Sequence, residues 1–430
     1  MASADDTFSL NLNLTPMKRI NLLLPILFSV AVLASCHKGA YIPPHKGGID
    51  LKLSATQLQQ ASTNNTFSLN LFKTVSAGNS NSTNLFMSPL SVSIALGMTA
   101  NGAKGETLTA MQNTLGFKNY TADQVNSYYN TLINELPELD PDNTFNIANS
   151  IWYRQTFNVL PQFTLTEGSY YKANVQALDF TSPSSINTIN NWVSDQTKGK
   201  ITQIVNKIDP GDMMFLVNTI YFKSGWASKF DPANTKKQSF TLANNSQVQT
   251  DFMNGSDMAC NVSNNTDANL LELPYSNNKY SMVIVMPNGS KSVNDIVSEM
   301  DSTTWKSWTS HLGTYTADIT IPKFQFSYSA NLNVPLTTMG MGVAFSQLAD
   351  FSNINGSGGL LISAVNHKAF VDVDESGTTA AAVTSVTVTT SVALNNQVII
   401  NHPFIFVIRE MKTGLIVFTG IVNDPTQSGQ

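Results

Sequence analysis

Cysteine is nearly absent from this chain: its 430 residues contain two, Cys36 and Cys260, which excludes a framework of several disulfides. Charged residues are also few, at 12% of the chain, and the formal net charge is -5. No long basic run occurs, so we expect no nucleic-acid partner. The motifs G-x-S-x-G and H-E-x-x-H and the Walker loop do not occur. Nothing therefore predicts an activated nucleophile, a metal site or a bound cofactor, and we do not expect an enzyme.

The longest apolar run lies near the N-terminus, at residues 20–33, directly after Lys18 and Arg19. It ends in the letters LASC, of which the last is Cys36. A basic start, an apolar stretch and small residues at its end are typical of an export signal. The run is too short for a good spanning helix. Its end resembles a bacterial lipobox, which predicts that Cys36 is the lipidated first residue of the mature chain.

These features divide the sequence into three parts. We expect a signal segment at residues 1–35, with the true start at Met17, and then a lipid-anchored tether at residues 36–55. We expect one large domain at residues 56–430. The protein would be exported and held through Cys36 on a bacterial membrane, at the outer membrane or the cell surface.

The most informative segment is VDVDESGTTAAAVTSVTVTTS at residues 371–391, which is rich in Val and Thr and contains no Pro. Residues 376–401 carry no charge. This composition favours a β-strand, although the sequence offers no obvious neighbour for it. Alternate side chains from Thr378 onward would share the inward face of such a strand. That set is Thr378, Ala380, Ala382, Thr384, Val386, Val388 and Thr390.

The residues around Gly377 resemble the hinge of the reactive-centre loop of the serpin family. A glycine suits a hinge because it adopts backbone angles that other residues avoid. Two departures from the family pattern occur: Thr379 stands where an acidic residue is usual, and Val383 follows the alanines. The hinge residues are Glu375, Gly377, Thr378, Thr379, Ala380, Ala381 and Ala382.

The resemblance extends over most of the chain, and chance does not account for so many motifs in the same order. They are NLFMSPLS at residues 84–91, GAKGET at 102–107, TKGKI at 197–201, NTIYFKSGW at 218–226, ELPY at 272–275, IPKF at 321–324, HKA at 367–369 and HPF at 402–404.

The resemblance implies an α+β serpin fold with three β-sheets, about eight to nine helices and an exposed reactive-centre loop at about residues 375–400. It implies that His367 is buried and hydrogen-bonded with Asn218 and Ser88, in the region called the shutter. It also implies that Trp226 covers the top of the main sheet, where the loop would enter. Thr378 would then lie in water until the loop is cut, and its side chain would enter the sheet first.

The implied activity is suicide inhibition of a protease, in which the cleaved loop inserts into the main sheet and traps the attacker. The expected reactive bond is Ser391-Val392, with Val392-Ala393 as the alternative. These small uncharged residues fit an elastase-like or subtilisin-like serine protease, and a papain-like cysteine protease stays open as a further target. The alternative function is that of a non-inhibitory serpin acting as a binding scaffold. We expect a monomer. We also expect no heparin site, because residues 121–142 are acidic.

Overall fold

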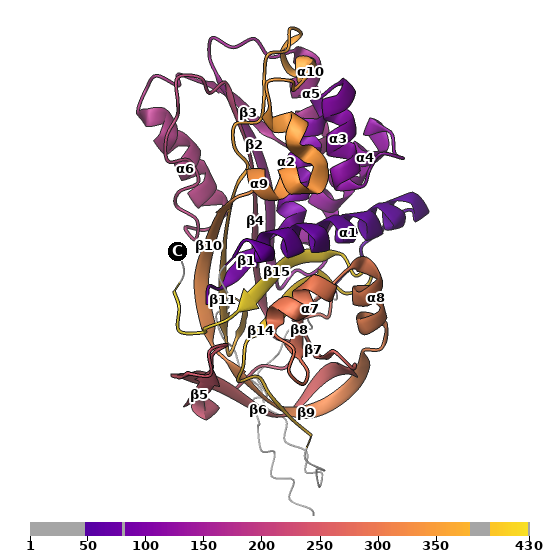
Figure 1. The fold of residues 1–430 in the computed structure, drawn as a ribbon, viewed down its shortest axis with the longest axis vertical. Coiled ribbons are helices and arrows are strands. Elements are labelled where there is room, and N and C mark those ends of the chain that lie inside the picture. The colour runs from indigo at the N-terminus through magenta and orange to yellow at the C-terminus, as the bar shows by residue number, and fades with distance from the viewer. Residues whose placement is uncertain (1–47, 80–81, 379–395, 429–430) are drawn as a thin grey trace, which may run out of the picture. The chain divides into compact units, whose positions relative to one another are not determined.

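The computed structural model describes residues 48–79, 82–378 and 396–428 (Figure 1). The described residues form one compact unit. Leu51 is already buried, and the backbone of Ile49 bonds to Leu139. The tether predicted for residues 36–55 is therefore too long at its C-terminal end, because the residues just before the first helix pack on the body. The predicted signal segment and Cys36 lie outside the described residues.

A six-stranded sheet runs along the molecule. In spatial order its strands are β10 (Phe324–Asn331), β11 (Asn366–Asp374), β12 (Gly377–Thr378), β4 (Met214–Gly225), β2 (Thr144–Arg154) and β3 (Asn174–Leu178). Strand β12 has only two residues, and it is antiparallel to both of its neighbours. Because β4 and β11 both run antiparallel to β12, they run parallel to each other.

A second, nine-stranded sheet supplies much of the core. Its order is β1 (Leu85–Met87), β15 (Ile416–Val422), β14 (Phe404–Glu410), β8 (Tyr280–Pro287), β7 (Ala268–Pro274), β6 (Gln247–Asn264), β9 (Gly313–Pro322) and β13 (Gln397–Ile399), with β5 (Lys236–Thr241) paired to β6. The sequence predicted three sheets. The 18-residue strand β6 pairs with β5 and β9 along most of its length and with β7 at its end, so two of the expected sheets are joined into one.

The described residues contain ten α-helices, one more than the upper expectation, because two single turns of four residues are included. The helices are α1 (Ala55–Ala77), α2 (Pro89–Asn101), α3 (Gly105–Leu115), α4 (Ala122–Glu135), α5 (Pro161–Tyr171), α6 (Ser184–Gln196), α7 (Val293–Glu299), α8 (Ser302–Ser310), α9 (Asn333–Leu336) and α10 (Ser352–Asn355). Short helical turns occur at Leu136–Glu138, Pro232–Asn234, Thr337–Met341 and Gly342–Phe345. The predicted α+β fold is confirmed.

The two faces of the six-stranded sheet have different cover (Figure 1). On one face, Ile189 and Val193 of α6 pack with Trp152 and Val217 of the sheet. On the other face, Phe222 of β4 belongs to the large core that the nine-stranded sheet and α2 share. Within the part of the chain that the structure describes, no helix has the length and apolar character needed to cross a membrane.

Candidate functional site

The hinge enters the six-stranded sheet between β11 and β4. Gly377 pairs with Gly225 of β4 and Asp374 of β11, and Thr378 follows it into the sheet. Gly377 has a φ of 148°, and a Cβ atom at this position would lie 2.1 Å from the carbonyl oxygen of Ser224. Only glycine fits this approach. The turn before it is held by Asp374 Oδ1, which accepts from the backbone N–H of Ser376 at 2.8 Å.

Thr378 is buried, with 3% of its surface exposed. Its hydroxyl forms a 2.6 Å hydrogen bond with the Tyr275 hydroxyl. The prediction that this side chain waits in water until cleavage is therefore wrong for the form described here. The backbone before Thr378 can turn into the sheet because two glycines, Gly377 and Gly225, face each other there.

Trp226 lies at the same end of the sheet, buried beside the hinge. Its ring stacks on Tyr275 with 4.7 Å between the ring centroids and 7° between the planes. Its Nε1 donates a 2.9 Å hydrogen bond to the carbonyl oxygen of Asp374. Trp226 and Tyr275 therefore each bond to the hinge, Trp226 at the turn and Tyr275 at Thr378.

An ion pair anchors the start of the hinge. Lys323 Nζ lies 2.8 Å from Glu375 Oε2, and the Thr235 hydroxyl donates to Oε1 at 2.6 Å. Burial opposes ionisation of Glu375, but the hydrogen bonds from Lys323 and Thr235 outweigh it and hold the pKa of this carboxyl below its ordinary value. The carboxylate is thus charged at neutral pH, and it ties the hinge to Lys323, the single residue that links β9 and β10.

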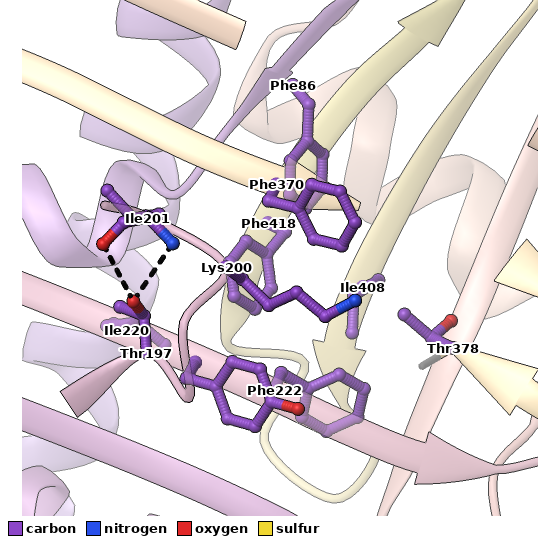
Figure 2. A pocket seen from close by; sticks show the side chains of 11 residues that line it. Phe86, Thr197, Lys200, Ile201, Ile220, Phe222, Phe370, Thr378, Ile408 and Phe418 are labelled. Atoms are coloured by element: carbon purple, nitrogen blue, oxygen red, sulfur yellow. Dashed lines mark hydrogen bonds between the residues drawn. The ribbon is translucent and has the colours of Figure 1, made fainter. Parts of the chain in front are cut away.

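After Thr378 the described residues place no further strand between β4 and β11. Among the described residues, β4 and β11 are joined only through β12 and form no ladder with each other. A cavity of about 20 Å³, room for about one water molecule, lies between them (Figure 2). Tyr221 and Phe222 of β4 face Phe370 of β11 across it. The remaining lining residues are Phe86, Thr197, Lys200, Ile201, Ile220, Thr378, Ile408 and Phe418.

The shutter residues lie further along the same two strands. His367 is buried on β11, and its Nε2 accepts a 3.2 Å hydrogen bond from the backbone N–H of Ser88. Burial lowers the pKa of His367 to about 4, so the ring is neutral at pH 7. The Ser88 hydroxyl caps α2 by accepting from the N–H of Ser91, and it donates to the carbonyl of Val417.

Asn218 on β4 does not bond to His367, contrary to the prediction. Its Oδ1 accepts from the Ser91 hydroxyl, and its Nδ2 donates to Asn149 Oδ1 at 2.6 Å. The two shutter side chains therefore have separate partners, Ser88 and Ser91, and both partners lie at the start of α2.

A chain of polar side chains continues from the shutter into the helices. Asn149 donates to the carbonyl of Tyr171, whose hydroxyl donates to Asn126. Asn126 donates to Asn101, and Asn101 donates to Glu167 Oε1 at 2.9 Å. Glu167 is fully buried, and its Oε2 has no hydrogen-bond partner among the described residues. Burial raises the pKa of this carboxyl to about 8, opposed by the bond from Asn101.

Part of the predicted site lies outside the described residues. This holds for the rest of the hinge, for the reactive bond and for the lipidation site: Thr379, Ala380, Ala381, Ala382, Ser391, Val392, Ala393 and Cys36. Of the predicted residues that are described, Glu375, Gly377, Thr378 and Trp226 lie together at one end of the gap, and Ser88 and His367 lie in contact further along it.

Sequence reasoning gave no role to several residues that the structure brings to the site. Tyr275, Lys323 and Lys200 each belong to a motif that was matched as a string, ELPY, IPKF and TKGKI. Their partners lie far away in the sequence: Tyr275 and Thr378 are 103 positions apart. No local pattern could have paired them.

Comparison with known proteins gives a consistent result. A family described as "Serpin (serine protease inhibitor)" matches residues 62–425. The leukocyte elastase inhibitor of Xenopus laevis is 34% identical over 370 residues, which cover 84% of this chain and 97% of that protein. Among solved structures, the native state of the thermophilic serpin tengpin has a TM-score of 0.78 and 33% identity, covering 87% of this chain and 96% of that one. Human thyroxine-binding globulin in complex with thyroxine has a TM-score of 0.80 and 31% identity, covering 87% and 100%.

Proposed function

This chain belongs to the serpin family, and we propose that it is a suicide-type inhibitor of an elastase-like or subtilisin-like protease. The observation that supports this most directly is the pair β4 and β11, which hold a two-residue strand between them and have no further strand between them among the described residues. In the proposed mechanism a protease cuts the loop near Ser391 and Val392, and the freed segment continues β12 along this gap.

The register of β12 predicts where each inserted residue would go. Thr378 pairs with Ser224 and Val373, so each later residue of the loop should pair with an earlier residue of both strands. Ala380 would lie between Phe222 and Val371, and Ala382 between Ile220 and Ala369. All four of these neighbours are buried. The small inward set of the loop thus suits a packed face, where a larger side chain would not fit without strain.

The same register brings Thr384 between Asn218 and His367. These two side chains are the ones that the gap keeps apart, and a hydroxyl can both donate and accept a hydrogen bond. We infer that Thr384 completes the shutter when the loop inserts.

Insertion would release enough free energy to drive the trap. Each hydrogen bond contributes about 0.5–1.5 kcal/mol net, so a strand of about a dozen residues gains on the order of 10 kcal/mol before apolar burial. That is comparable to the whole stability of many domains. The intact protein would accordingly be held by a kinetic barrier, away from its most stable form.

The residues at the proposed reactive bond indicate the class of target. Ser391, Val392 and Ala393 are small and uncharged, and no Lys or Arg occurs in the loop for a trypsin-like pocket. The Xenopus relative is named for inhibition of leukocyte elastase. A papain-like cysteine protease is a further candidate.

The rival function is a binding scaffold that does not trap proteases. Human thyroxine-binding globulin, which is 31% identical to this chain, is named for binding thyroxine and supports this alternative. The small residues Ala380, Ala381 and Ala382 favour the inhibitor, because a scaffold does not need a hinge that can enter a packed sheet.

The test is incubation with elastase and subtilisin, followed by denaturing gel electrophoresis. An inhibitor gives a covalent complex that survives denaturation and releases a C-terminal peptide beginning at Val392 or Ala393. Cleavage with full recovery of the protease would support the scaffold instead.

We propose separately that a lipid on Cys36 anchors the protein to a bacterial membrane. The supporting feature is the basic, apolar and small-residue order before Cys36. Stable anchoring requires more than one acyl chain, as a bacterial lipoprotein cysteine would carry. Cys36→Ser should move the protein from the membrane fraction to the soluble fraction. An unmodified Cys36 in the mature protein would contradict the anchor.

A further inference from the structure

Lys200 crosses the open gap between β4 and β11. Its backbone belongs to a turn after α6, in which Lys198 and Gly199 both have positive φ angles of 53° and 76°. The Thr197 hydroxyl fixes this turn by donating to the carbonyl of Val193 on α6 and accepting from the N–H of Ile201. The side chain of Lys200 therefore starts from a rigid support.

That support stands on the β4 side of the gap. Ile201 packs in one apolar cluster with Val217 of β4 and Trp152 of β2. Thr197 and Ile201 also line the cavity beside Tyr221. The turn is thus held against β4 and β2, and it would move together with them if the sheet opened.

The tip of Lys200 reaches the other side. Its Nζ lies 4.5 Å from the centre of the Phe370 ring and 3.9 Å from Asp372 Oδ2, both on β11. Figure 2 shows the side chain extended past the Phe370 ring. A cation over an aromatic face and near a carboxylate is attracted to both. One side chain thus links two strands that have no ladder with each other.

These contacts coincide with the path of the inserting loop. Continuing the register of β12, Thr379 would pair with Asp372 and Lys223, and Ala381 with Phe370 and Tyr221. Lys200 occupies the outward side of the gap at these two steps. The loop would have to displace its tip, or slide beneath it, directly after Thr378.

We propose that Lys200 is a strap that restrains loop insertion at the step after Thr378, a role that rests on the proposed function of the loop. The contact between Lys200 and Asp372 is weak because both side chains are partly exposed. The side chains of Lys200 and Asp372 keep 32% and 24% of their surfaces exposed, so solvent screens their attraction. The strap delays the entry of the loop, and a strand that has begun to pair opens it.

The test measures entry into the gap without any protease. A labelled synthetic peptide with the sequence of residues 379–391 is added to the intact protein, and its uptake is followed by fluorescence anisotropy. Lys200→Ala should take up the peptide about three to ten times faster than the parent, the factor expected from losing one weak ion pair and one cation–π contact. Lys200→Arg, which keeps the charge, should stay within about twofold of the parent.

A matched control lies a short way along the same segment. Lys207 forms a 2.8 Å ion pair with Asp209 and keeps 78% of its side chain exposed, away from the gap. Lys207→Ala removes the same charge and should leave the uptake rate unchanged. Asp372→Asn should give a smaller acceleration than Lys200→Ala, because the contact with Phe370 remains. Thermal unfolding of each variant shows whether it is folded.

The outcomes test the role of Lys200 separately from the proposed inhibitor function. Faster uptake by Lys200→Ala, together with no trapping of any protease by the parent, would keep the strap and reject the inhibitor. Equal uptake by Lys200→Ala and the parent would overturn the strap, even if the parent traps protease efficiently. Acceleration by Lys207→Ala to the same extent would also overturn it, because the effect would then come from net charge. Failure of every variant to take up the peptide would overturn it as well.

Discussion

The two ends of the gap between β4 and β11 differ in how far they are closed. At the hinge end, Gly377 and Thr378 pair with both strands, and Thr378 bonds to Tyr275. At the shutter end, Asn218 and His367 lie on the same two strands with no strand between them among the described residues, and without a bond to each other. Within the part of the chain that the structure describes, the sheet thus holds two residues of the hinge strand.

The difference has a physical cause in the side chains at each end. Two glycines meet at the hinge end, so the backbones approach closely at no steric cost. At the shutter end each polar side chain has a partner at the start of α2, Ser88 for His367 and Ser91 for Asn218. Keeping the gap open therefore leaves neither of them unpaired, and no lost hydrogen bond pulls the strands together.

The largest expected effect comes from Thr378→Arg, which breaks the closed end. The side chain is buried at 3% exposure, and an unpaired buried charge costs on the order of 3–5 kcal/mol. The hinge should leave the sheet, and insertion after cleavage should slow by orders of magnitude. The variant should be cut at the same bond yet release its protease, and the stoichiometry of inhibition should rise steeply.

The control for that experiment is Thr379→Arg, one position further along. It belongs to the outward set of the loop, where a charge can reach water. Its stoichiometry of inhibition should stay near that of the parent. If both variants trap protease as well as the parent does, the register of the hinge is wrong.

The next largest effect is expected at Glu167, the buried carboxyl at the far end of the polar chain that continues from the shutter into the helices. The pKa of Glu167 is raised from 4.5 to about 8, so the unfolded chain ionises first, and the free energy of unfolding should fall as pH rises from 4.5 to 8. His367, whose pKa is lowered from 6.5 to about 4, has the opposite effect, but only below pH 6.5. Between pH 6.5 and 8 the parent should lose on the order of 2 kcal/mol through Glu167.

Glu167→Gln should remove this loss, because an amide does not ionise. Chemical denaturation at pH 6.5 and pH 8 gives the two free energies of unfolding. Glu106→Gln, which changes an exposed carboxylate at the start of α3, is the control and should keep the slope of the parent. An equal slope in the parent and in Glu167→Gln would show that this carboxyl does not govern stability in the range.

A smaller effect is expected from Glu375→Gln at the closed end. The variant loses the attraction to Lys323, whose side chain is 37% exposed, so the cost should be only about 1–2 kcal/mol. Because the pKa of Glu375 is held below its ordinary value, this contribution is present above pH 4.5 and disappears as pH falls through the lowered pKa. Lys323→Gln should cost a similar amount, and the double variant should cost no more than either single one. Additive costs would mean that the two residues do not act as a pair.

The sequence predicted the fold class, because it follows from the motifs, and it placed Thr378 on the inward face of a strand from the two-residue period. The other residues of that face lie outside the described residues. Gly377 was predictable from the hinge motif. The structure gives the physical reason for a glycine there, because a position with a φ of 148° against a carbonyl oxygen accepts no other residue. The resting position of Thr378 was not predictable. It depends on Tyr275, which lies on a different part of the chain and supplies the bond that holds the hinge in the sheet.

The shutter shows the same limit. The burial of His367 and its contact with Ser88 followed from resemblance, but the separation of His367 from Asn218 did not. His367 bonds to Ser88 and Asn218 to Ser91, both at the start of α2. A partner on a distant helix cannot be read from the sequence of either strand alone.

The central claim is that the cleaved loop inserts into the gap between β4 and β11. Thermal unfolding before and after cleavage tests this claim most directly. The protein is cut once in the loop by a protease that it does not trap, and both forms are melted under the same conditions. If the loop inserts, the cleaved form should melt on the order of 10–20 °C higher, because it gains a full central strand. A melting temperature that stays the same or falls after the cut would contradict the account.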